Sequence, residues 1–240
     1  MLCCMAVIAL TSADLRNARE YIQVLDPLGA EVRLLLPAEQ GSVPTDQIMD
    51  GVGGLLLTGG PDVDPCHYGA TPDPDAGLHR CPPLDDLEFR LLDYALDQDM
   101  PVFAICRGMH VLNVAFGGKL IQDLPGHRTV EKDGNWESST HQIYLSPGAK
   151  AAAIIGSSGF FKVNSQHHQG LREAQRAPRL MTTGYSVEDG LIEALESPEH
   201  SWVIGIQCHP ERQDEVPRSF AKLFEGFSER AESFRMLTQV

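Results

Sequence analysis

The first half of the chain alternates short apolar runs with segments of helical hydrophobic spacing, and this order constrains the fold more than any other feature. Each apolar run has the length of a buried strand and is bounded by turn residues. The order β-α-β-α-β-α-β-α predicts an α/β protein with a mostly parallel central sheet and helices on both faces. The predicted strands lie within 1–10, 31–36, 54–58 and 101–105, and the predicted helices cover 14–28, 46–50, 84–96 and 107–115.

The second half of the chain is richer in predicted strands, which would add antiparallel strands to the sheet. We find no internal repeat and no linker in the 240 residues, so we expect a single domain over residues 1–240. The candidate strands are 142–145, 152–155, 161–163, 180–185, 191–195 and 202–207, and a closing helix is predicted from about 215 to 235.

A long loop rich in Pro, Gly and Asp follows the strand at 54–58 and lasts to about residue 83. Loops of more than about 15 residues without an element of their own are usually functional or mobile. Because this one leaves a buried strand through Gly59 and Gly60, residues 61–83 are predicted to form a wall or lid of an active site. A plain surface excursion is the alternative. Beyond the loop, Asp85, Asp86 and Glu88 are predicted to be exposed near a helix N-terminus, where acids suit the helix dipole.

Composition narrows the classes of function. The formal net charge of −14 argues against a nucleic-acid partner, because phosphate-backbone binding uses clustered Lys and Arg. No apolar run reaches the roughly 20 residues of a membrane span, and the apolar start lacks the basic residues of a signal peptide. The six cysteines show neither zinc-type pairing nor a disulfide framework, and Cys3 and Cys4 fit a buried or frayed terminus. We therefore expect free thiols in the cytoplasm.

One of these cysteines has the surroundings of a catalytic nucleophile. The apolar run 101–105 ends at Cys106, with the small residues Ala104 and Gly108 two positions to either side, and a helical pattern begins at once. This is the pattern of a nucleophile elbow, a strand and a helix joined by a sharp turn that carries the reactive side chain. The helix N-terminus would favour the thiolate. A buried core cysteine is the alternative interpretation.

A base for this nucleophile is predicted where another strand ends, at His209-Pro210-Glu211. Alternate residues of an extended chain point to the same side, so Glu211 can orient the His209 ring and stabilise its charged form. An oxyanion hole needs backbone N–H groups, and the residue after the nucleophile, Arg107, supplies one. Gly60, at the end of a neighbouring strand, can supply a second because it has no side chain in the way.

These motifs resemble the class I glutamine amidotransferase-like superfamily, and within it most closely the γ-glutamyl-γ-aminobutyrate hydrolase family, peptidase C26. The matching segments occur in the family's order over nearly the whole chain. They are Thr58–Pro65 with Tyr68-Gly69, Asp85 through Glu88, Ile105–Met109, Leu112–Val114, Gly117-Gly118, Gln122–Leu124, Val163–Gln169, Asp189–Ala194 and His209–Glu211.

The resemblance implies a flavodoxin-like three-layer sandwich and a Cys106–His209–Glu211 triad that forms a γ-glutamyl thioester on Cys106. Gly60 and Arg107 take the oxyanion roles by the same comparison. The family lines its substrate pocket at the position of His167, His168 and Gln169. From the residues alone, such a His-His pair can equally be hydrogen-bonded structure, and it has no third ligand at a spacing that would indicate a metal site. No cofactor is implied.

Two positions depart from the wider pattern. His110 stands four residues after the nucleophile, where many relatives carry a glutamine that helps hold the glutamyl group, so glutamine itself is a doubtful substrate. His110 can still donate a hydrogen bond to a substrate, or merely fill the pocket. Cys208 stands where relatives often carry an aromatic residue, and its side chain is predicted to point into the core, away from His209.

The leading hypothesis is a cytoplasmic hydrolase that cleaves the γ-glutamyl amide of a small adduct, such as γ-glutamyl-γ-aminobutyrate or a γ-glutamyl polyamine of polyamine catabolism, and releases glutamate. A glutaminase subunit that passes ammonia to a separate synthase is the second hypothesis. A binding protein that keeps the fold without turnover is the third. The expected partner is the small-molecule substrate, and the sequence leaves a homodimer open.

Overall fold

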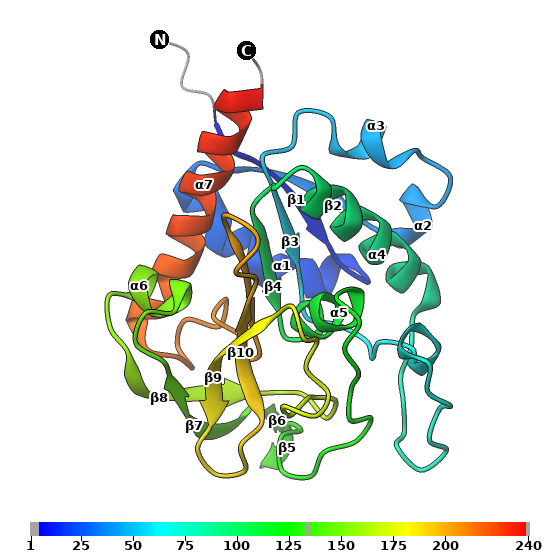
Figure 1. The fold of residues 1–240 in the computed structure, drawn as a ribbon, viewed down its shortest axis with the longest axis vertical. Coiled ribbons are helices and arrows are strands. Elements are labelled where there is room, and N and C mark those ends of the chain that lie inside the picture. The colour runs from blue at the N-terminus through cyan, green and yellow to red at the C-terminus, as the bar shows by residue number, and fades with distance from the viewer. Residues whose placement is uncertain (1–4, 133–134, 239–240) are drawn as a thin grey trace.

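A computed structural model of the protein describes residues 5–132 and 135–238. Its central feature is a nine-stranded sheet in which five neighbouring strands are parallel, as the alternation of strands and helices predicts (Figure 1). Four of the five come from the first half of the chain, and the fifth is the last strand of the second half. In sheet order they are β2 (Glu31–Leu35), β1 (Val7–Thr11), β3 (Gly54–Leu57), β4 (Val102–Ile105) and β11 (Val203–Ile206).

Helices cover both faces of the parallel strands, and each face has its own hydrophobic core. On one face, α4 (Pro82–Asp97) and α5 (Arg107–Ala115) pack on the sheet through residues such as Leu91 and Leu112. On the other, α1 (Leu15–Leu25) and α7 (Lys222–Thr238) pack through residues such as Leu25 and Phe224. Asp14 begins α1 by accepting hydrogen bonds from the backbone N–H groups of residues 16 and 17.

Antiparallel strands from the second half extend the sheet beyond β11, as predicted. They lie in the order β10 (Ile192–Glu196), β9 (Met181–Ser186), β7 (Ser139–Leu145) and β8 (Gly159–Ser165). A separate two-stranded ribbon, β5 (Val130–Lys132) with β6 (Asn135–Glu137), was not predicted. Strand β10 of this extension pairs directly with β11, the strand that leads to His209.

The prediction of a strand at 152–155 is wrong, because this segment belongs to helix α6 (Lys150–Ile155). A short apolar run cannot be assigned to strand or helix by its periodicity alone. Three consecutive alanines favour a helix, and Gly156 ends it in the left-handed conformation with φ of 86°. Ala151 and Ile155 of α6 are buried in the same hydrophobic core as the apolar residues of α7.

Smaller differences concern the ends of elements. The closing helix α7 begins at Lys222 after a 3₁₀ turn at Arg218–Ala221, later than predicted, because Pro217 favours an extended conformation at the residue before it. Two short helices, α2 (Pro37–Gln40) and α3 (Thr45–Met49), lie between β2 and β3, and only the second was predicted. The expectations for Cys3 and Cys4 concern residues outside the described part of the chain.

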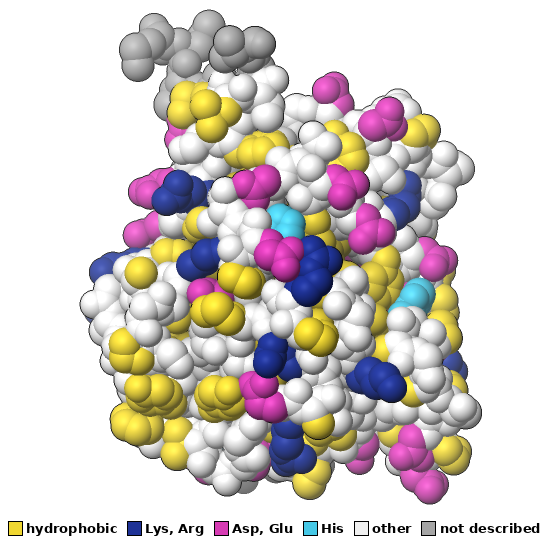
Figure 2. All heavy atoms as spheres, in the orientation of Figure 1, with side chains coloured by type: hydrophobic (Ala, Val, Ile, Leu, Met, Phe, Trp, Pro, Cys, Tyr) yellow, Lys and Arg dark blue, Asp and Glu magenta, His cyan; other side chains and the backbone are white. Residues whose placement is uncertain are grey.

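No helix in the described ranges is both long enough and apolar enough to cross a membrane. On the face shown in Figure 2, acidic and basic side chains are interspersed, and hydrophobic side chains gather at the lower left, over β7, β8 and β9. Phe160 and Met181 are among the exposed hydrophobic residues of these strands, at 64% and 47% of their surface.

Candidate active site

Cys106 stands in the sharp turn between β4 and α5, as the elbow pattern predicts. Its backbone has φ of 51° and ψ of −106°, a conformation that non-glycine residues rarely adopt. Its N–H donates to the carbonyl of Ile206 on β11 over 2.7 Å, which fixes the turn to the sheet. A Cβ at residue 108 would collide with the backbone of Leu57, so the turn requires Gly108. Contacts with β11 and β3, the two strands beside β4, therefore hold the strained turn in place.

His209 and Glu211 follow the end of β11 and face each other, as their spacing predicts. The His209 Nδ1 lies 2.5 Å from the Glu211 Oε1, and both side chains are buried. Asn164 of β8 fixes the backbone of His209 at both polar atoms: its amide oxygen accepts from the N–H over 2.8 Å and its Nδ2 donates to the carbonyl over 3.0 Å. The antiparallel extension of the sheet thus positions the histidine.

The charges around His209 favour its protonated form. Burial alone would lower the pKa of His209, but the negative charges of Glu211 and of the Cys106 thiolate outweigh it and hold that pKa well above its usual value. Tyr21 of α1 lies on the same ring, with its hydroxyl 3.4 Å from the His209 Nδ1 and 3.0 Å from the Gly59 nitrogen, whose N–H donates to it. Nothing in the sequence indicated this role for Tyr21, because its position is that of an ordinary residue on the apolar face of a helix.

A cavity of about 350 Å³ opens over these residues. Cys106, His209, Glu211 and Gly60 line it, so the predicted nucleophile, the predicted base and one predicted oxyanion donor share one space. Arg107 begins α5, where the first N–H groups of a helix have no partner within the helix. The other lining residues are Arg16, Asn17, Glu20, Tyr21, Gly59, Gln166 and Arg212.

Behind the elbow lies a second set of charges that the sequence did not reveal. The Arg107 guanidinium is 2% exposed and forms ion pairs with Asp85 and Glu88 of α4. The prediction that Asp85 and Glu88 are exposed is therefore wrong, while Asp86 between them does face solvent. Glu88 also accepts a hydrogen bond of 2.6 Å from the Thr11 hydroxyl. These contacts join α4 and β1 to the first residue after Cys106.

Of the four residues proposed to bind substrate, the structure buries three and leaves His168 partly exposed, and none of the four lines the cavity. The His110 Nε2 lies 2.8 Å from the Gln207 Oε1, and the Gln207 Nε2 in turn lies 3.5 Å from the Cys106 Sγ. Burial lowers the pKa of His110 to about 4, so its imidazole is neutral at pH 7. His110 thus contacts Cys106 through Gln207.

The segment His167–Gln169 forms hydrogen bonds and an ion pair with the loop at 61–83. Gln169 exchanges hydrogen bonds of 3.0 and 3.3 Å with the backbone of Val63, and His168 lies 2.9 Å from Asp62. The loop 61–83 is thereby fastened to this segment, and it contains a 3₁₀ turn at Pro65–Tyr68. No residue of the loop lines the cavity, which Gly59 and Gly60 border directly before it.

Cys208 points into the core, as predicted. It is 1% exposed among the apolar residues of the α1 and α7 face, and burial raises the pKa of its thiol well above the usual value. A protonated thiol is a poor nucleophile. Of the two cysteines near His209, only Cys106 lies at the cavity.

Comparison with known proteins decides the family. A family model described as peptidase C26 matches residues 9–211, which include Cys106, His209 and Glu211. The chain belongs to the peptidase C26 family. It is 34% identical over 195 residues to the γ-glutamyl-γ-aminobutyrate hydrolase PuuD of Escherichia coli, covering 76% of this chain and 73% of that protein. It is 36% identical over 215 residues to a provisionally named glutamine amidotransferase of Mycobacterium tuberculosis, covering 87% of this chain and 67% of that protein.

The fold is that of class I glutamine amidotransferase domains. A protein of Thermoplasma acidophilum that is provisionally named as one chain of a GMP synthase superimposes with a TM-score of 0.69, covering 98% of each chain at 16% identity. With its family and these relatives, the protein is an enzyme of hydrolase or glutamine amidotransferase-like type.

Proposed function

We propose that the protein is a cysteine-dependent hydrolase that cleaves the γ-glutamyl amide bond of a small adduct and releases glutamate. The observation that carries this proposal is the shared cavity, which brings Cys106 at a strained elbow together with His209 bound to Glu211. Amide cleavage through a covalent intermediate needs a thiolate and a base that is held by a third group. The relatives' names supply the γ-glutamyl class of substrate.

In the proposed mechanism, the Cys106 thiolate attacks the γ-carbonyl carbon, and the backbone N–H groups of Gly60 and Arg107 stabilise the resulting oxyanion. Protonated His209 gives its proton to the leaving nitrogen as the C–N bond breaks, which leaves a γ-glutamyl thioester. Neutral His209 then takes a proton from water, whose oxygen attacks the thioester carbonyl. The C–S bond breaks and returns the Cys106 thiolate, with glutamate as product.

A small amine portion fits the space available. The cavity of about 350 Å³ is near the lower end for small-molecule sites, and its wall carries both positive and negative side chains, Arg16 and Glu20 among them. Adducts of the γ-glutamyl-γ-aminobutyrate or γ-glutamyl-polyamine type are of this size. We also infer that the protein is a single domain and that it is cytoplasmic. The cytoplasm is inferred because four described cysteines are free and the proposed nucleophile must remain reduced.

A glutaminase subunit that supplies ammonia to a separate synthase is the second candidate, favoured by the provisional name of the Mycobacterium tuberculosis relative. His110 stands against it, because its ring is engaged with Gln207 instead of facing the cavity.

The test offers the purified protein γ-glutamyl-γ-aminobutyrate, γ-glutamyl-putrescine and glutamine separately and follows glutamate release. We expect release from at least one of the first two, little from glutamine, and a mass increase of one glutamyl group on Cys106 when the reaction is quenched early. Preferential turnover of glutamine would favour the glutaminase. No release from any of the three, together with a Cys106 thiol inert to alkylation, would overturn both enzyme functions.

A further inference from the structure

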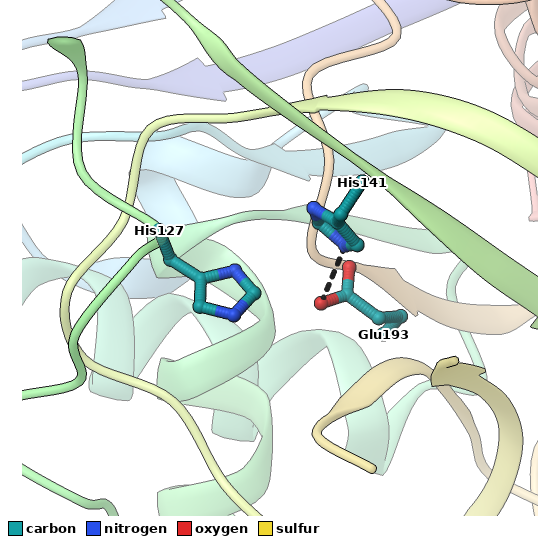
Figure 3. A group of neighbouring side chains, drawn as sticks. All are labelled: His127, His141 and Glu193. Carbon is teal, nitrogen blue, oxygen red and sulfur yellow. Dashed lines mark ion pairs between the residues drawn. The ribbon is translucent and has the colours of Figure 1, made fainter. Parts of the chain in front are cut away.

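Three side chains from separate segments, His127, His141 and Glu193, form a cluster outside the cavity at Cys106. His127 lies in the loop after α5, His141 on β7 and Glu193 on β10. One ligand atom of each lies within 4.8 Å of the others. Figure 3 shows the Glu193 carboxylate directed at the His141 ring, with the His127 ring opposite the pair. The proposed hydrolysis uses none of the three.

Glu193 and His141 lack the hydrogen bonds that buried polar groups normally have. The Glu193 side chain is fully buried, and neither of its oxygens accepts a hydrogen bond from the side chains or backbone that the structure describes. The His141 side chain is 10% exposed, and its Nε2 forms an ion pair of 3.1 Å with the Glu193 Oε1 without the alignment of a hydrogen bond. The His141 Nδ1 has no hydrogen-bond partner among the described residues. The ion pair leaves the Glu193 Oε2 and the His141 Nδ1 without a hydrogen bond in the part of the chain that the structure describes, whereas buried polar atoms are normally hydrogen-bonded or bound to a metal ion.

His127 is oriented in the way that metal-binding histidines are. Its Nε2 lies 3.1 Å from the Asp189 Oδ2, so it can donate its ring proton to that carboxylate. The Nδ1 then carries a lone pair, next to the Ser165 hydroxyl at 3.2 Å, and this hydroxyl can turn to the His127 carbonyl at 3.1 Å instead. A carboxylate on the outer nitrogen commonly fixes the tautomer of a metal-bound imidazole.

A fourth nitrogen lies beside the cluster. The His167 Nε2 is buried without a hydrogen-bond partner among the described residues, and its ring centroid lies 4.8 Å from that of His127. The His167 Nδ1 is 2.9 Å from the Gln169 carbonyl, which leaves the unbonded Nε2 as a lone-pair donor.

We propose that His127, His141 and Glu193 bind a divalent transition-metal ion, for which zinc is the best match, with His167 or a water as the fourth ligand. Two imidazoles and a carboxylate form a ligand set typical of zinc, whereas calcium and magnesium prefer oxygen ligands alone. Zinc bonds of about 2.0–2.1 Å place tetrahedral ligand atoms roughly 3.4 Å apart. Binding therefore requires small rotations of the three side chains that bring their ligand atoms closer together by about an ångström.

The ion stabilises the fold beside the active site and takes no part in the chemistry at Cys106. It joins a loop to β7 and β10, and the Glu193 carbonyl accepts a hydrogen bond of 2.9 Å from the Gln207 N–H, two residues before His209. Because the ion binds the folded chain and not the unfolded one, its binding raises the melting temperature.

The experiment titrates the full-length protein, first stripped with a chelator, with Zn²⁺ and Co²⁺. We expect one ion per chain, a higher melting temperature, and a cobalt spectrum with visible d–d bands but no thiolate charge-transfer band. Glu193→Gln keeps the size of the side chain and removes its charge, and we expect it to weaken binding by at least about tenfold, the loss typical even for outer partners of a metal site. His79→Gln, at an exposed histidine, and Cys106→Ala serve as matched controls that retain binding.

A wild-type protein that gains neither melting temperature nor a cobalt spectrum overturns the site. So does equal affinity in Glu193→Gln, or a charge-transfer band that Cys106→Ala abolishes, which would assign the ion to the thiol. If Glu193→Gln does not fold, His127→Asn gives the same test, and loss of the cobalt bands in a folded His127→Asn supports the site while their retention overturns it.

Discussion

Two carboxylate-bound cations flank Cys106, and their surroundings differ. His209 with Glu211 borders the cavity, and its imidazole can exchange a proton with a bound molecule. Arg107 with Asp85 and Glu88 is enclosed by α4, β1 and the elbow, and its side chain is 2% exposed. A histidine titrates near neutral pH and a guanidinium does not. The first pair is therefore suited to chemistry, and the second to holding a strained turn.

Among changes at the cavity, removing the proposed nucleophile should have the largest effect on activity. We expect Cys106→Ala to lower kcat by at least about 10³-fold, since catalysis then relies on binding and the oxyanion hole alone. Cys106→Gly should lose the same activity yet unfold at a higher temperature than Cys106→Ala, because glycine accepts the positive φ without strain. Glutamate release and thermal unfolding of both variants measure this. Residual activity near that of the wild type would show that another residue is the nucleophile.

The carboxylate that holds His209 should come next. Glu211→Gln keeps the shape of the side chain but removes the charge, and we expect kcat to fall by about 10²–10⁴-fold, as for the third member of other triads. The variant should remain folded. A fall of less than threefold would mean that the His209 ring is oriented by Tyr21 and the backbone alone.

The same pair predicts a pH dependence of stability. Because the pKa of His209 is raised on folding, its protonation stabilises the folded state fully below the unfolded pKa of about 6.5, and this contribution is lost as the pH rises through the higher folded pKa. The gap in unfolding free energy between wild type and Glu211→Gln should thus be wider near pH 6 than well above the folded pKa. Denaturant unfolding across this range measures it, and a gap that widens with pH would contradict the assignment.

Removing Arg107 from its ion pairs with Asp85 and Glu88 should instead reduce the stability of the fold. We expect Arg107→Met to lower the unfolding free energy by about 3–5 kcal/mol, because it leaves two carboxylates buried without their cation. The backbone N–H of residue 107 remains, so kcat of the protein that stays folded should fall less than in Glu211→Gln. Asp85→Asn can be compared with Asp86→Asn, a matched change at an exposed neighbour. If the Asp86 variant is equally unstable, the buried pairing is not the cause.

The smallest effect is expected at Tyr21, which contacts His209 and Gly59 beside the cavity. Tyr21→Phe removes the acceptor of the Gly59 N–H, a loss of about 1 kcal/mol, and should change kcat by less than tenfold. Urea unfolding and steady-state kinetics test it. A loss as large as that of Glu211→Gln would make the hydroxyl part of the proton-transfer machinery.

Local pattern was sufficient for much of the fold and for the main features of the site. The order of the first half predicted the parallel strands, and strand ends at Cys106 and His209 brought these residues to the same edge of one sheet. It failed at 152–155, where a short apolar run suits either a strand or a helix. It also failed at Asp85 and Glu88, because acids near a helix N-terminus are usually solvated.

The sequence by itself therefore determined the elbow, the spacing of His209 and Glu211, and the family to which the chain belongs. Only the tertiary structure decided which charges are buried together. Arg107 meets acids from another helix, Tyr21 meets His209, and His127 meets His141 and Glu193, all across long separations in the chain. Periodicity records which face of an element is apolar. It does not record which polar residue on a distant element lies opposite, because that depends on how the layers pack.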